Sequence, residues 1–148
     1  MNSIEKGKFF RAELAKLQCL AARGYVDISM VHVPSTKLIP EGYLINFKNQ
    51  NSRSIDIKIF SLEDKEIVAV NIANTEAEES FSLINWLKYK GLFKSYDEFR
   101  LTAYAGDFSE RVQSFLLRLS EILCSEQLNL VLIGKNWESI PFDWAGMR

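Results

Sequence analysis

Two neighbouring apolar patterns in the middle of the chain predict a β-hairpin. Ile55, Ile57 and Ile59 alternate with mostly polar residues, which is the period of a strand with one buried face. Residues 67–72 form a nearly continuous apolar run, as in a central strand that is covered on both faces. Charged residues between the two runs suit a solvent-exposed turn. We therefore expect residues 53–74 to form the centre of a sheet.

The same alternation recurs earlier in the chain and predicts two more strands. Residues 25–33 and 43–48 alternate between apolar and polar side chains. Pro34, Pro40 and Gly42 interrupt the chain between them, as expected of a loop. Four strands in a row with short links indicate an antiparallel meander.

Helical spacing of apolar residues predicts helices on both sides of these strands. The predicted helices span residues 3–22, 75–90 and 107–125, with one further helical turn at 95–100. Residues 128–133 are expected to form a last strand. Strands and helices are segregated along most of the chain, so we predict an α+β fold. Its order is an N-terminal helix, a four-stranded antiparallel meander, two to three helices and a C-terminal strand.

Length and composition indicate one globular domain. The 148 residues contain 47% hydrophobic and 25% charged residues, and no linker or repeat is visible. We expect a single domain over residues 1–148 with an aromatic-rich tail at 135–148. The net charge of −1 gives no general attraction to nucleic acid or anionic membrane. No apolar run approaches the roughly 18 residues of a membrane span, and no signal peptide is visible, so we expect a cytoplasmic protein.

Few residues suit metal or nucleophilic chemistry. Cys19 and Cys124 lie far apart within predicted helices, so we expect reduced cysteines that pack as small apolar groups. His32, the only histidine, lies on a predicted strand, where a structural, hydrogen-bonded role is favoured. Glycine-rich phosphate loops are absent. We therefore predict no metal site, no cofactor and no catalytic residue, which leaves enzymatic activity an open question leaning towards none.

Two carboxylates resemble, in outline, the core of metal-dependent nucleases. Such cores place an aspartate on one strand and a Glu-x-Lys motif on the next. Asp56 and Glu66 lie on predicted neighbouring strands, but Val68 stands where the lysine is needed. The resemblance would imply metal-dependent cleavage of nucleic acid. The missing lysine favours Asp56 as a solvated residue on the outer face of the sheet.

Acidic and aromatic residues form the leading candidate site. The predicted partner-binding residues are Glu63, Asp64, Glu66, Glu76, Glu79, Trp137, Phe142 and Trp144. The acidic members would form a rim that attracts a basic partner, and the aromatic members would anchor it. The helix dipole explains an acidic cluster at a helix start equally well. Our leading hypothesis is a small protein-binding domain, most concretely an inhibitor or immunity-type protein that blocks a basic, toxin-like protein by occupancy.

Two other functions stay open. Lys88, Lys90, Lys94 and Arg100 are interleaved with aromatic residues, a pattern of single-strand nucleic-acid binders. The same pattern suits a helix with its aromatic side chains inward and its lysines in water. A third hypothesis is a homodimeric, chaperone-like module that uses the second face of the sheet as its interface.

Overall fold

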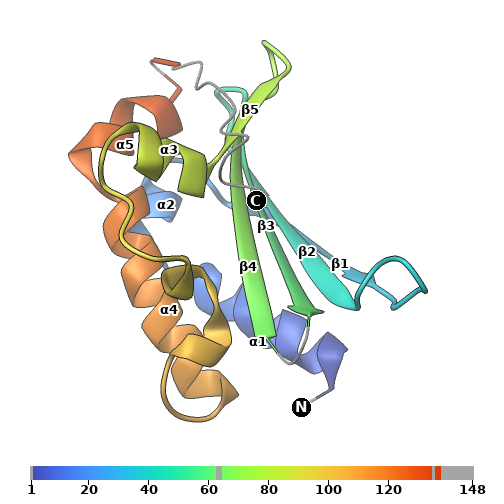
Figure 1. Ribbon diagram of the computed structural model, residues 1–148. Helices are drawn as coiled ribbons and strands as arrows, with labels where there is room; N and C mark the ends of the chain where they lie inside the picture. Colours follow the sequence, from blue (N-terminus) through green and yellow to red (C-terminus); the bar gives the residue numbers. More distant parts are fainter. Residues whose placement is uncertain (1, 63–64, 135, 138–148) are drawn as a thin grey trace.

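The computed structural model describes residues 2–62, 65–134 and 136–137. One antiparallel sheet has the strand order β1-β2-β3-β4-β5, and the helices lie on one side of it (Figure 1). The strands are β1 (Asp27–Val33), β2 (Gly42–Lys48), β3 (Arg53–Leu62), β4 (Lys65–Asn74) and β5 (Glu79–Ser82). The helices are α1 (Ser3–Leu14), α2 (Gln18–Ala22), α3 (Leu83–Tyr89), α4 (Phe108–Leu123) and α5 (Glu126–Leu132), with short 3-10 helices at Tyr96–Phe99 and Leu101–Ala103. The α+β class is confirmed.

The predicted central hairpin forms the middle of the sheet. Ile55 pairs with Ile72 and Ile57 with Val70, and these side chains are at most 3% exposed. The apolar run 67–72 alternates in its burial, so Val70 and Ile72 face the helices. Burial of a continuous apolar row on β3 and β4 specifies the register, because a slip of one residue would turn every side chain over.

Helix α1 lies close to β1 and β2 because a glycine faces the sheet. A Cβ atom at Gly7 would be 2.8 Å from Met30 Sδ and 3.2 Å from the Tyr43 ring. Phe10, one turn further along α1, is fully buried and lies 6.0 Å from the ring of Phe115 on α4. The first helix therefore joins the sheet and α4 in one core.

Three predicted elements differ from the structure. The predicted helix 75–90 contains strand β5 followed by α3, which begins where the Ser82 side chain accepts a hydrogen bond from the Asn85 amide. Residues 128–133 lie in or next to α5, so the fifth strand is β5 and not a C-terminal strand. Helix 3–22 is interrupted between α1 and α2. In the first two cases a short apolar segment fits both helix and strand, and packing decides between them.

Helix α4 matches its prediction most closely. Asp107 and Glu110 form a complete capping box at its start. Its buried face contacts the sheet side of the core, and the Phe115 ring lies 6.2 to 6.4 Å from the rings of Tyr104 and Phe99. Strong apolar periodicity and a clear N-cap made this helix readable from sequence alone.

Polar side chains from β3 and from the segments that flank β1 and β3 hold the last turn of α5. Arg53 Nε donates to Val131 O at 2.9 Å, and the Tyr25 hydroxyl donates to Leu132 O at 2.6 Å. The Asn51 amide donates to Ile133 O at 2.8 Å. The last carbonyls of a helix lack partners inside the helix, so these donors satisfy them and fix α5 against the sheet. The positive charge of the buried Arg53 also lies at the C-terminal end of α5, where the helix dipole is negative, and this placement is stabilising.

The two cysteines form a disulfide bond, contrary to our expectation. Cys19 on α2 is bonded to Cys124 at the end of α4, and their Cα atoms are 6.1 Å apart. A separation of 105 residues in the chain concealed this proximity, because only the packing of α2 against α4 brings the two side chains together.

Candidate functional site

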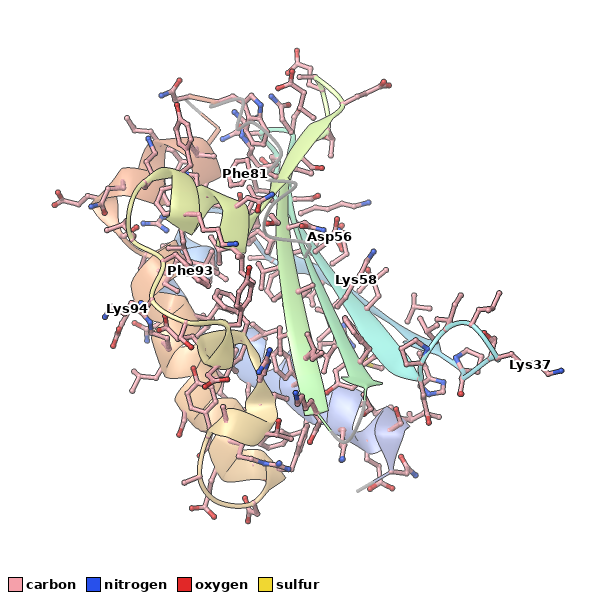
Figure 2. All side chains as sticks on the ribbon, viewed as in Figure 1. Lys37, Asp56, Lys58, Phe81, Phe93 and Lys94 are labelled. Carbon is pink, nitrogen blue, oxygen red and sulfur yellow. A yellow bond between two sulfur atoms is a disulfide. The ribbon has the colours of Figure 1, made fainter. Side chains whose placement is uncertain are left out.

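The two faces of the sheet differ in what covers them. Side chains that point away from the helices form what we call the open face, and no helix of the described residues covers it (Figure 1). Figure 2 shows Asp56 and Lys58 of β3 pointing to this side. On the neighbouring strand, Leu44 and Asn46 alternate with the buried Ile45 and share this face. The open face is therefore the principal sheet surface left for contacts.

A polar row crosses the middle of the open face. Register places Ser29, Asn46, Asp56, Asn71 and Ser82 next to one another across the five strands. The Asn46 amide donates a hydrogen bond to the Asp56 carboxylate. The neighbour of Asp56 on this face is thus the neutral side chain of Asn46. The prediction that Asp56 lies on the outer face of the sheet is confirmed.

The nuclease-like arrangement does not form. Glu66 lies on the helix side of the sheet, where it contacts Lys6 of α1 at 4.0 Å and Arg111 of α4 at 3.3 Å. Asp56 points to the opposite face. Two carboxylates on opposite faces of one sheet cannot bind the same metal ion, so the resemblance to nuclease cores is wrong. The resemblance was based on the order of the strands, and strand order does not specify to which face of the sheet each carboxylate points.

A small polar cavity lies beside the Glu66 ion pairs. It measures about 210 Å³, and its lining includes Lys6, Glu41, Tyr43 and Glu66. The buried Tyr43 hydroxyl has no hydrogen-bond partner among the described residues. Burial, and then the nearby Glu66 charge, raise the pKa of Tyr43. The cavity thus contains a phenol held in its neutral form beside a paired carboxylate.

His32 lies at the border of this polar region. Its Nε2 atom is 2.9 Å from Glu41 Oε1, which confirms a hydrogen-bonded histidine. The hydrogen bond to His32 is the main cause that lowers the pKa of the Glu41 carboxyl. Glu41 lines the cavity, but His32 does not. The contact between them is exposed and has the geometry of a surface hydrogen bond.

An apolar cavity lies on the open face beneath the loop between β1 and β2. Its volume is about 410 Å³, and Lys58 is the only charged residue in its lining. The apolar side chains that line it are Val33, Ile39, Pro40, Leu44 and Phe60. Nearby, Val31 is 56% exposed and Leu38 94% exposed, while Ile39 is 53% exposed. We call Val31, Leu38, Ile39, Leu44 and Phe60 the hairpin patch.

Sequence reasoning missed the hairpin patch. Pro34 and Pro40 predict a loop between the first two strands but do not indicate a binding surface there. The usable signal was a pair of large apolar residues, Leu38 and Ile39, in a segment that cannot bury them in a helix or strand. Exposed apolar residues that gather on a surface are a feature of interaction sites.

The predicted acidic rim is not one surface. Glu66 is engaged by Lys6 and Arg111, whereas Glu76 and Glu79 follow the other end of β4, about 26 Å away at 3.3 Å per residue. Glu63 and Asp64 lie outside the described residues. The expectation of a basic partner stays a prediction, and the described acidic residues do not converge to support it.

The aromatic part of the predicted site is partly visible. Trp137 Nε1 donates to Glu79 at 2.6 Å, and its ring lies 5.2 Å from the Phe81 ring. The Arg53 guanidinium stacks on the same indole at 5.1 Å. Trp137 therefore anchors the end of the described chain to β5. Phe142 and Trp144 lie outside the described residues.

The basic stretch is organised around its own aromatic residues. Lys88 Nζ is 2.5 Å from the Tyr96 hydroxyl and lies over the Phe93 ring. The remaining cations are Lys90 over the Tyr89 ring, Arg100 paired with Asp97 at 3.2 Å, and Lys94, which points away from the sheet in Figure 2. Trp86 is fully buried and so unable to stack on a base. Nucleic-acid binding by this stretch stays a prediction.

Neither a metal site nor a membrane-spanning helix in the described residues, nor a similar protein, was found to indicate a function. Among the described residues, no three histidine, cysteine or acidic side chains are placed to hold a metal ion. The described helices include none with the length and apolarity required to cross a membrane. Comparison of the chain with protein-family models, curated proteins and solved structures found no match.

Proposed function

We propose that this protein is a small protein-binding domain that blocks another protein by occupying it, as inhibitors and immunity-type proteins do. The observation that carries the proposal is the hairpin patch with its apolar cavity. Folding leaves Val31, Leu38 and Ile39 more than half exposed, although each could contribute to a core. Contact with a protein partner would remove this apolar surface from water, which stabilises association.

The cavity supports an inserted side chain from a partner. Its volume is about 410 Å³ and its walls are almost entirely apolar. Interface hot spots typically consist of a large side chain that fills such a pocket and is shielded from water by the surrounding contacts. Inhibition by occupancy requires only such a contact and no reaction centre on this chain.

The test compares two apolar-to-acidic substitutions on opposite parts of the surface. Ile39→Asp lies in the hairpin patch, whereas Leu117→Asp lies on the exposed face of α4, where Leu117 is 68% exposed. Each variant and the unmodified chain are immobilised and exposed to extracts of the source cells. A partner retained at one-to-one stoichiometry by the unmodified chain and Leu117→Asp, but lost with Ile39→Asp, is expected.

The inhibitory part needs its own measurement. The retained partner is purified, and its activity is titrated with the unmodified chain and with Ile39→Asp. Complete inhibition at one equivalent by the unmodified chain alone is expected. Retention of the same proteins by all three chains would argue against the hairpin patch as the binding surface, and a fully active saturated partner would argue against inhibition.

A further inference from the structure

Among the described residues, no strand pairs with the outer edge of β1, although the Arg11 side chain binds one of its carbonyl groups, that of Ile28. β1 is the first strand in the sheet order, and in the part of the chain that the structure describes its only partner strand is β2, through seven consecutive residues without a bulge. By contrast, the outer side of β4 is covered by β5 and by a bridge between Ile67 and Arg100. Natural proteins usually protect an edge with proline, bulges or covering segments, because its free N–H and C=O groups accept a further strand.

A groove with an excess of positive charge lies at the start of this edge. A cavity of about 360 Å³ lies between α1 and the start of β1, and the small side chains of Ala12 and Ala15 leave room in it. Arg11 Nη2 donates to Ile28 O at 3.0 Å, which places the guanidinium beside the strand edge. Lys8 also lines the groove, and Asp27 is the one carboxylate in its lining, so the cations outnumber the anions by two to one. Neither cation forms an ion pair with a carboxylate in the described part of the chain.

On the open face, the second half of this edge is apolar, whereas Ser29 in the first half belongs to the polar row. β1 points Val31 and Val33 to the open face, next to Leu44 and the hairpin cavity. A strand that pairs with β1 would point alternate side chains to the two sides of the sheet. One set would meet Lys8 and Arg11, and the other set would meet the hairpin patch. The groove, where two cations outnumber Asp27, favours acidic residues on the side of α1, and the patch favours apolar residues on the open face.

We propose that the partner adds an extended strand of alternating acidic and apolar residues to the edge of β1. This inference rests on the proposed function, because it specifies how a protein partner would reach the hairpin patch. Backbone hydrogen bonds would supply affinity, and the two rows of side chains would supply selectivity. The acidic residues of the sequence led us to expect a basic partner, whereas the groove beside β1 favours a partner segment that is acidic.

A second copy of this chain fits the edge less well. If β1 of another molecule paired with it, the side chains facing α1 would be Ile28, Met30 and His32. None of these is acidic, so the excess of Lys8 and Arg11 over Asp27 in the groove would receive no added negative charge. Charge complementarity thus favours a foreign acidic strand over a symmetric dimer.

The probe is a capped decapeptide of alternating glutamate and valine, and the control replaces each glutamate with lysine. Binding to the full chain is measured by titration calorimetry at low salt, and amide hydrogen exchange locates it. The glutamate peptide is expected to bind at least tenfold more tightly than the lysine peptide and to slow exchange of β1 amides. Raising the salt concentration is expected to weaken the complex, because exposed charges are screened.

Two charge reversals provide matched variants. Lys8→Glu is expected to reduce binding of the glutamate peptide at least tenfold, whereas Lys94→Glu, on the other side of the helix layer, is expected to leave it unchanged (Figure 2). Equal binding of both peptides, or no effect of Lys8→Glu, would overturn the inference. So would a dimeric mass with protected β1 amides in the absence of peptide.

The outcome is separable from that of the capture experiment. If Ile39→Asp abolishes partner capture but the glutamate peptide does not bind, only the edge inference fails. If the peptide binds at β1 while capture is indifferent to Ile39→Asp, the inference about the edge stands and the hairpin patch loses its assigned role.

Discussion

The two faces of the sheet show how one set of strands separates stability from recognition. On the covered face, Ile57 and Val70 pair across β3 and β4, and both are almost completely buried. On the open face, Lys58 of the same strand makes no ion pair with any described residue and lines an apolar cavity. Burial specifies the first set through packing. The second set is free to be chosen for contact with another molecule.

The largest test of this comparison uses two phenylalanines on adjacent strands. Phe47 is 1% exposed on the covered face, and Phe60 is partly exposed on the open face. Phe47→Ala is expected to lower the free energy of unfolding by about 3–5 kcal/mol, because it removes a buried ring and leaves a cavity. Phe60→Ala should cost less than half as much. Urea denaturation measures both, and equal losses would contradict the division between faces.

The disulfide provides the next test of where stability resides. Reduction, or Cys19→Ser with Cys124→Ser, is expected to lower the free energy of unfolding by about 2–4 kcal/mol, because the bond closes a loop of 105 residues in the unfolded chain. The doubly substituted chain serves as the control, since added reductant should not change its stability. If reductant does not change the free energy of unfolding of the unmodified chain, the two cysteines are not bonded in solution.

Arg53 tests the polar link between the sheet and α5. Arg53→Met keeps an unbranched side chain but removes the donors to Val131 O and Asn136 O. A loss of about 2 kcal/mol is expected, because hydrogen bonds from a charged group are stronger than neutral ones. Lys48→Met, at an exposed position on β2, is the matched control and should change thermal stability little.

Alkaline pH tests the buried tyrosines of the covered side. Burial raises the pKa of both Tyr25 and Tyr43 above the ordinary value near 10. The folded state therefore holds these protons more tightly than the unfolded state, so their contribution is complete below about pH 10 and is lost as pH rises further. Circular dichroism and tyrosinate absorbance should show the fall together. Tyr25→Phe should make it shallower; an unchanged slope would exclude Tyr25 as a cause.

The smallest effect is expected on the open face. Lys58→Ala should change the free energy of unfolding by no more than about 0.5 kcal/mol, because the side chain is exposed and makes no ion pair with the described residues. Thermal denaturation measures the change. A loss comparable to that of Phe47→Ala would mean that the open face also contributes to the stability of the monomer.

Strong periodic patterns were predictable, and short apolar segments were not. The alternation of Ile55, Ile57 and Ile59 specified a strand, and the capping box at Asp107 specified the start of α4. Residues 79–82 and 128–133 are too short for periodicity to distinguish strand from helix. Pairing of Phe81 with Ile72 decided the first segment, and packing of α5 against the sheet decided the second.

The candidate site was less predictable than the fold. Residue type suggested an acidic rim, but type does not say that Glu66 faces Lys6 and Arg111 on the helix side. Nor does it say that Lys8 and Arg11 lie beside the start of β1. These relations depend on which helix lies over which strand, and that arrangement is set by contacts between residues far apart in the chain.

The amino-acid sequence by itself determined the class of the fold, the central hairpin and the register of its buried row, because local periodicity and burial act on neighbouring residues. The tertiary structure alone decided the Cys19–Cys124 bond, the place of the fifth strand and the surfaces left open. Those features arise only when distant segments meet, since the same side chain stabilises a core or forms an interface according to what packs above it.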